Sequence, residues 1–181
     1  MTSGKRRPDP EARARELLAK LRIGHWPVAV ETVARKLGVT VTFVPLEETL
    51  SGMIVMKNTA HVVVNSLHHP NRQRFTIAHE IGHFVLHMQE IGSEVHVDKK
   101  FLAFARDNKS SDGSDRREIE ANRFAAALLV PRDCLVEALQ GRILDVEDDD
   151  LVEDLAKRFQ VSRQMMAFRI AGLAERGRAQ G

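Results

Sequence analysis

The most informative part of the sequence reads Arg74-Phe-Thr-Ile-Ala-His79-Glu80-Ile-Gly-His83-Phe-Val-Leu-His87. Residues four apart lie on one face of an α-helix, about 6 Å along its axis, so His79 and His83 can converge on one ion. Glu80 is turned away from the two imidazoles but is close enough to reach a water held on that ion. Two neutral imidazoles beside a carboxylate form the zinc-hydrolase arrangement, in which the carboxylate accepts a proton from the water.

A His-Glu-x-x-His pattern also arises by chance, and a histidine on an apolar helix face is usually a hydrogen-bonded core residue. The residues around this pattern favour a metal site, because they are almost all apolar: Phe75, Ala78, Ile81, Gly82, Val85 and Leu86. Two imidazoles and a carboxylate inside such a helix cost several kcal/mol unless they are coordinated or paired. We therefore expect a buried helix that binds Zn²⁺, with Mn²⁺ as an alternative ion in activity assays.

A third protein ligand is needed, because catalytic zinc sites usually bind three side chains and leave one position for water. Glu118 and Asn122 lie four apart in a second helical stretch, so one can bind the ion while the other hydrogen-bonds a ligand imidazole. Glu120 is the alternative, but it lies about 160° around the helix from Asn122. We expect Glu118 to be the ligand and Asn122 to support it.

His87 lies too far along the first helix to share the ion, since it is about 12 Å along the axis from His79. We expect it behind the ligands or at the rim of the site. The chain contains no tyrosine, so the donor that stabilises the tetrahedral oxyanion must be another group. His61, His87 and His96 are candidates between which the sequence does not choose, and the substrate-binding residues are not identified.

The composition indicates one globular domain, residues 1–181. Of the 181 residues 43% are hydrophobic and 29% charged, and the formal net charge of +2 does not indicate nucleic-acid binding. The single cysteine, Cys134, can form no internal disulfide and is expected to be a small core residue. No signal peptide or long apolar run is recognisable, so we expect a cytoplasmic protein that does not bind a membrane.

The N-terminal half is expected to combine two helices with a small sheet. Residues 1–8 form a flexible basic tail, a helix begins at Asp9-Pro10-Glu11 and ends at Gly24, and a second helix, 30–37, is closed by Gly38. Short connections favour meanders, so we expect an antiparallel three-stranded sheet, with strands at 39–44, 53–56 and 61–65. The strand at 51–56 is the expected edge for a substrate strand.

The C-terminal half is expected to be mainly helical. The helix with the histidines runs from Pro70 to about Met88, and a second long helix covers 117–130. Between them, 101–105 is a short helix or strand, and 107–115 is a flexible loop, either a lid or a plain connection. Residues 141–181 form a helical subregion that ends like a helix-turn-helix, with helices at 151–159 and 163–173. The fold class is therefore α+β.

Both site-bearing segments resemble a known family. The stretch from Arg72 to His87, followed by Glu118-x-x-Ala121-Asn122-x-Phe124-Ala125-x-x-Leu128-Leu129-x-Pro131, is similar to the ImmA/IrrE family of zinc metallo-endopeptidases. The resemblance covers roughly residues 28–173 and includes 33–41, 51–52, Asn65 and 155–162. One departure is Val130, where methionine is common before the proline.

This resemblance implies a gluzincin-like site with His79, His83 and Glu118 as ligands and Glu80 as general base. It also implies peptide hydrolysis, with a helix-turn-helix (Xre-type) transcriptional repressor as the substrate. Cleavage of that repressor would relieve repression in a stress response or on a mobile element.

Two other functions remain open at this point. A non-catalytic, zinc-stabilised module could bind and sequester a repressor, and it would need the three ligands but not Glu80. Direct DNA binding could use the helices between 151 and 173, with Arg163 and Arg169 on the second of them. Against it, much of that helix is apolar (Met165, Met166, Phe168 and Ile170), so we expect no direct contact with nucleic acid.

Overall fold

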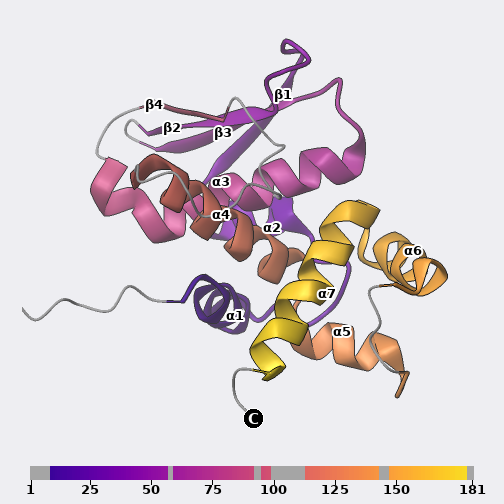
Figure 1. Cartoon of the computed structure of the whole chain (residues 1–181). Helices are drawn as coiled ribbons and strands as arrows, with labels where there is room; N and C mark the ends of the chain where they lie inside the picture. The colour runs from indigo at the N-terminus through magenta and orange to yellow at the C-terminus, as the bar shows by residue number, and fades with distance from the viewer. Residues whose placement is uncertain (1–8, 57–58, 92–94, 99–112, 143–146, 179–181) are drawn as a thin grey trace, which may run out of the picture.

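The structure is a computed structural model that describes residues 9–56, 59–91, 95–98, 113–142 and 147–178. Two helices precede three consecutive strands, and after a third helix and a fourth strand the rest of the described chain is helical (Figure 1), which confirms the α+β class. The helices are α1 (Pro10–Leu21), α2 (Val30–Lys36), α3 (Pro70–Ile91), α4 (Gly113–Leu129), α5 (Arg132–Leu139), α6 (Asp149–Phe159) and α7 (Arg163–Arg178), and the strands are β1 (Thr40–Val44), β2 (Gly52–Met56), β3 (Ala60–Asn65) and β4 (Val95–Asp98).

The first helix begins at the expected signal but ends earlier than expected, at Leu21, with Arg22 rather than Gly24 in the left-handed conformation. The carboxylate of Asp9 accepts a hydrogen bond from the Ala12 N–H at 3.2 Å, and Pro10 occupies the first helical position, where no N–H is needed. After α2, Leu37 is the C-cap and Gly38 comes next with a φ of +73°, which a glycine adopts without the strain of a Cβ.

The expectation of a three-stranded antiparallel sheet is wrong. The described sheet has four strands in the order β1-β3-β2-β4, and β1 runs parallel to β3. Only the pairs β2–β3 and β2–β4 are antiparallel. Strand β2 therefore lies between two neighbours, and the edges of the described sheet are β1 and β4.

The mixed topology has a local cause at the end of β3. The amide of the buried Asn65 donates to the carbonyl oxygens of Glu47 and Leu50 at 3.1 and 2.9 Å. Its Oδ1 accepts from the Leu46 N–H at 3.2 Å. These bonds hold the segment after β1 across the end of β3, so the chain reaches β2 on the far side of β3 instead of folding back beside β1.

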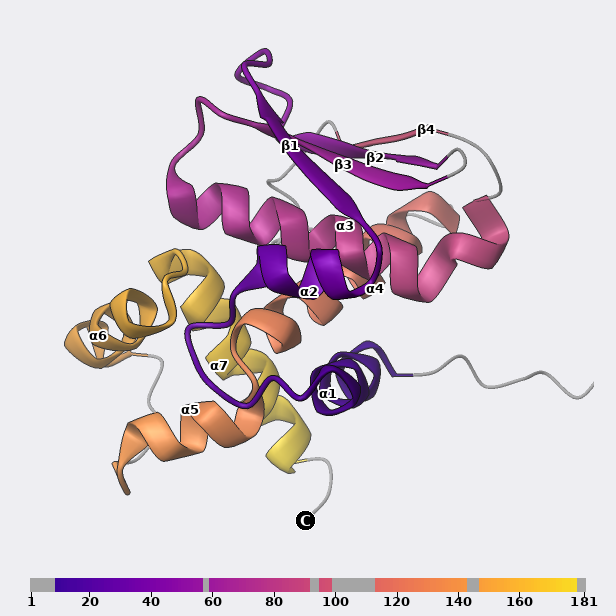
Figure 2. The same ribbon diagram turned by 180° about the vertical axis from the view of Figure 1, so that it is seen from behind.

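Helices cover one face of the sheet. In Figures 1 and 2 the sheet lies over α3, and α4 crosses α3 on the side away from the strands. Val62 and Val64 of β3 and Ile77 and Ile81 of α3 are fully buried between these layers. Burial of each such side chain contributes about 1.5–3 kcal/mol, so α3 is anchored by apolar contacts along its length.

The N-terminal end of α3 is tied to the turn between α6 and α7. The Asn71 amide donates to the Val161 carbonyl at 2.9 Å, while the Arg74 guanidinium donates to the carbonyls of Gln160 at 3.1 Å and Val28 at 2.9 Å. Burial lowers the pKa of Arg74 below its ordinary value, although the negative charge of Glu31 acts in the opposite direction and raises it.

The C-terminal helices confirm the expected helix-turn-helix shape and add α5, which was not expected. Cys134 on α5 is partly buried, whereas its neighbour Val136 is 60% exposed, so this segment is a surface helix. Arg169 on α7 is 3% exposed, pairs with Glu11 at 2.9 Å and donates to the Val130 carbonyl at 3.0 Å.

Two expectations lie outside the described residues, namely the tail at 1–8 and the element at 101–105. The loop expected at 107–115 is described only from residue 113, where α4 has already begun, and β4 was not expected. None of the helices in the described ranges combines the length and the apolar character of a membrane span.

Candidate metal centre and active site

Helix α3 carries an unusual set of buried polar side chains. His79, His83 and His87 are 2%, 0% and 1% exposed, and Glu80 is also fully buried. The helix packs into the core through Phe75 and other apolar residues, and the three histidines lie at the boundary between α3 and α4 rather than in water. Such burial requires coordination or pairing of the polar atoms.

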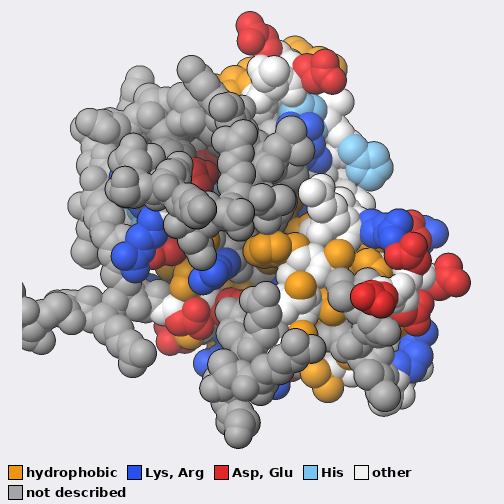
Figure 3. All heavy atoms as spheres, in the orientation of Figure 1, with side chains coloured by type: hydrophobic (Ala, Val, Ile, Leu, Met, Phe, Trp, Pro, Cys, Tyr) orange, Lys and Arg blue, Asp and Glu red, His pale blue; other side chains and the backbone are white. Residues whose placement is uncertain are grey.

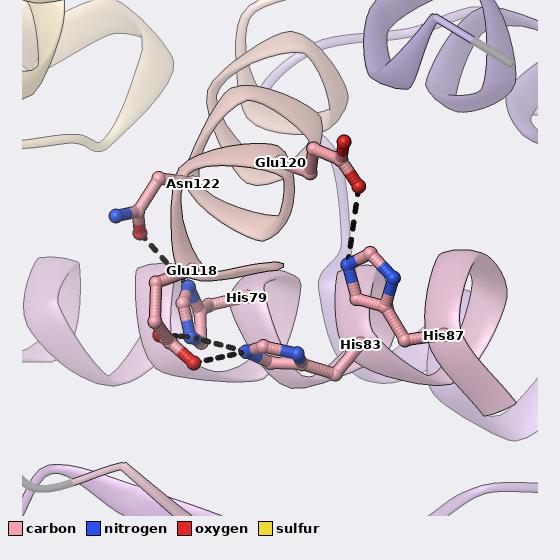
Figure 4. A network of polar contacts seen from close by, with 6 residues as sticks. All are labelled: His79, His83, His87, Glu118, Glu120 and Asn122. Carbon is pink, nitrogen blue, oxygen red and sulfur yellow. Dashed lines mark hydrogen bonds and ion pairs between the residues drawn. The ribbon is translucent and has the colours of Figure 1, made fainter. Parts of the chain in front are cut away.

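Three of the expected residues form one cluster (Figure 4). The Nε2 atoms of His79 and His83 are 3.0 Å apart, and the Glu118 carboxylate places one oxygen 3.2 Å from each of them. Together they form a group of metal-ligand type within the described residues. The side chain of Glu118 is 29% exposed, so solvent reaches the cluster from the α4 side.

The spacing of these atoms fits a zinc ion. Tetrahedral ligands with bonds of about 2.1 Å lie about 3.4 Å from one another. Here the two Nε2 atoms are 3.0 Å apart and each lies 3.2 Å from a different oxygen of the Glu118 carboxylate, so these separations are a few tenths of an ångström shorter. Two imidazoles and a carboxylate are also the donor types that zinc prefers, and three ligands leave a fourth position for water or substrate.

Asn122 fixes the orientation of one ligand. Its Oδ1 lies 2.9 Å from the Nδ1 of His79, and an amide oxygen can only accept, so Nδ1 carries the proton. In the neutral imidazole the lone pair is then on Nε2, which is the atom that faces Glu118 and His83. Asn122 therefore holds this ring in the tautomer that a metal ligand needs.

Glu120 points away from the cluster, in agreement with the helical geometry. Its carboxylate lies 3.8 Å from the Nε2 of His87 and accepts a hydrogen bond from Arg116 at 2.9 Å (Figure 4). His87 thus contacts α4 beside the cluster, with its ring centre 5.6 Å from that of His83. The contribution of Arg116 was not foreseen, although its spacing of four from Glu120 is the usual signal of such a pair.

The two site-bearing helices approach closely at Gly82, between the ligand histidines. A Cβ at this position would lie 3.1 Å from the Ala121 carbonyl oxygen and 3.2 Å from the Phe124 ring. Contacts this short are tighter than ordinary packing. The absence of a side chain at Gly82 therefore allows α4 to bring Glu118 to the histidines.

The other candidates are placed differently. His61 is exposed and bonds Thr59 Oγ1 at 2.7 Å, while its neighbour Val62 faces the core, so the structure does not bring His61 to the cluster. His96 pairs with Ile54 in the β2–β4 ladder, and its side chain lies outside the description. The expectation that residues 51–56 form the sheet edge for a substrate strand is wrong, because β2 is an inner strand of the described sheet.

A cavity of about 520 Å³ lies elsewhere, between α1, α5 and α7, and contains none of the cluster residues. It is lined partly by Glu11, Cys134 and Arg169. Burial raises the pKa of the Cys134 thiol, and the charges of Glu137 and Asp133 raise it further.

Two imidazoles from one helix and a carboxylate from a crossing helix, with a glutamate after the first histidine, form a group of the His-Glu-x-x-His type that could hold a metal ion. The sequence profile of the IrrE N-terminal-like domain, a peptidase family (M78), matches residues 34–171. The chain belongs to this metalloprotease family, which confirms the expected resemblance.

Two comparisons extend this result. The radiation response metalloprotease IrrE of Deinococcus radiodurans is 35% identical over 107 residues, which are 56% of this chain and 27% of the relative. This chain therefore matches only about a quarter of that protein. The structure of a Mycobacterium tuberculosis transcriptional regulator is similar with a TM-score of 0.60 and 22% identity, over 89% of this chain and 46% of the regulator. At this identity the likeness concerns the fold alone.

Proposed function

We propose that this protein is a zinc-dependent endopeptidase that cleaves a helix-turn-helix (Xre-type) repressor and thereby relieves repression. The observation that carries the proposal is the convergence of His79, His83 and Glu118, with Glu80 next to the first ligand on the same helix. Membership of the metalloprotease family supports a hydrolytic role for this arrangement.

The proposed roles are supported by the His-Glu-x-x-His pattern and by the cluster of His79, His83 and Glu118. Zn²⁺ bound by the three ligands would polarise the scissile carbonyl and lower the pKa of an attacking water towards 7. Glu80 accepts the proton of that water at its carboxylate and passes it to the leaving amine. Asn122 holds His79 in the ligand tautomer.

The substrate segment is proposed to add to the sheet at β4. Peptides often bind to proteins as an extra strand, through backbone hydrogen bonds that tolerate many sequences. Strand β4 is an edge of the described sheet, next to β2, and β2 contacts α3. An extended segment of the repressor could therefore be held beside the helix that carries the ligands.

A sequestering module would use the same ligands without catalysis, and Glu80→Gln separates the two functions. The purified protein is incubated with an Xre-type repressor as the candidate substrate, with zinc or manganese added. We expect the wild type to cleave the repressor, and Glu80→Gln to retain about one zinc per chain while losing cleavage. Cleavage by Glu80→Gln at the wild-type rate would refute the catalytic role, and a wild type that retains no zinc would refute the metal site.

Direct DNA binding is not supported by the described contacts of α7. Arg169 is buried against Glu11, and Arg163 pairs with Asp149 on α6. Met165, Met166 and Ile170 are buried as well, so the helix that would enter the major groove is packed into the protein.

A further inference from the structure

Strand β1 forms the second edge of the described sheet, and its outward backbone groups can be identified. The Val44 carbonyl accepts a hydrogen bond from the Ser66 N–H at 2.8 Å, so Val44 is bonded towards β3. Bonding direction alternates along a strand in a parallel ladder, so Thr42 is also directed at β3. Val41 and Phe43 therefore direct their N–H and C=O groups away from the sheet, where no described strand pairs with them.

Proteins protect exposed edges with charged residues, prolines or bulges. The residues of β1, Thr40-Val-Thr-Phe-Val44, include none of these. Pro45 directly follows the strand and has no N–H, so it limits the outward pairing to Val41 and Phe43. Phe43 is 44% exposed, and Leu67, just beyond the end of β3, is 72% exposed. The edge is therefore uncharged, β-prone and accompanied by exposed apolar surface.

Charges of opposite sign stand at the two ends of this strand. Arg35, at the end of α2, precedes β1 and is exposed, whereas Glu47 and Glu48, which follow β1, are exposed acids. Figure 3 shows acidic side chains over the loop that follows β1. An antiparallel neighbour of the same sequence would bring each basic end beside an acidic end, while a parallel neighbour would bring like charges together.

We propose that two copies of this chain associate by antiparallel pairing of their β1 strands about a two-fold axis at Thr42. Val41 of each copy exchanges backbone hydrogen bonds with Phe43 of the other, and the two Thr42 residues face each other. The sheets of the two copies become continuous, and β4, the other edge of the described sheet, takes no part in the pairing. A strand pair of this length buries less than the roughly 1,200 Å² of a typical stable interface, so the dimer dissociates at low concentration.

Charge reversal and restoration test the geometry. Sedimentation velocity of the zinc-loaded protein between about 1 and 200 µM gives the dimer Kd, which we expect in the micromolar range. The double variant Glu47→Lys/Glu48→Lys should raise Kd about tenfold or more, since basic groups would then meet at both ends. Adding Arg35→Glu to these changes should restore Kd to within about threefold of the wild type.

Phe43→Lys places a charge on the edge strand and should abolish dimers. Val136→Lys, on the exposed face of α5, is the matched control and should leave the dimer Kd unchanged. Circular dichroism confirms that each variant is folded. A wild type that stays monomeric at the highest concentration, or dimers that Phe43→Lys and the charge reversals do not weaken, would overturn the proposal. Glu80→Gln should dimerise like the wild type, because the pairing does not depend on the metal site.

Discussion

Replacement of Gly82 by alanine tests how closely α3 and α4 must approach for the ligands to meet. The added Cβ would lie 3.1 Å from the Ala121 carbonyl oxygen and 3.2 Å from both the Ala121 Cα and the Phe124 ring. Two of these three atoms belong to the backbone of α4, so the helix must move by a few tenths of an ångström. Glu118 lies one turn before Ala121, and its carboxylate must move with the helix.

Two opposing effects set the stability of this variant. Alanine in place of glycine inside a helix stabilises by about 1 kcal/mol. The crowded contact costs about 1–3 kcal/mol. We therefore expect the metal-free protein to lose at most about 2 kcal/mol. Metal-ligand distances tolerate only about ±0.2 Å, so zinc affinity should fall about tenfold.

Zinc affinity is measured by competition with a chromophoric chelator, and the free energy of unfolding by urea titration with and without zinc. Gly24→Ala is the control, because nothing lies within 4 Å of a Cβ at that position. Its zinc affinity should equal that of the wild type. A folded Gly82→Ala variant that binds zinc within twofold of the wild type would refute the close-approach argument.

Three further changes test other parts of the structure. Asn122→Leu should weaken zinc binding about 10–100-fold. Asn122→Asp keeps the hydrogen-bond acceptor, so its zinc affinity should stay within a few-fold of the wild type. Equal losses of zinc affinity in the two variants, measured in the chelator assay, would contradict the tautomer argument. Arg74→Met removes the donors to the carbonyls of Val28 and Gln160 and should lower the free energy of urea unfolding by about 1–3 kcal/mol. The pKa of Cys134 is raised, so its thiolate forms only at higher pH. At pH 8 it should react with a disulfide reagent more slowly than in the unfolded chain, and a rate equal to that of the unfolded chain would contradict this shift.

The arrangement of the ligands could be predicted because it depends on local helical geometry. The spacings of His79 and His83, and of Glu118 and Asn122, each place two side chains on one helix face. The same helical spacing predicted that Glu120 points away from His79 and His83, and the structure places its carboxylate beside His87. Helices are regular, so residue spacing within them carries three-dimensional information.

The order of the strands could not be predicted, because it depends on contacts between distant residues. Short connections suggested a meander, but Asn65 binds the segment around Leu46 and Glu47 through its side-chain amide. A single asparagine at a strand end gives no sign of this role in the sequence. Strand β4 was missed for a related reason, since only its pairing with β2 shows that it belongs to the sheet.

The ion pair between Glu11 and Arg169 has a consequence for the folding pathway. It joins the first and last helices, and Arg169 also donates to the Val130 carbonyl, so the contact can form only after the intervening chain is in place. Contacts between residues so far apart in sequence are costly to close early and tend to form late in folding. Loss of this contact should therefore accelerate unfolding while leaving the refolding rate nearly unchanged, which stopped-flow kinetics of Arg169→Met would reveal. The ion pair would then determine the unfolding rate, and so the lifetime of the native state, rather than the folding rate.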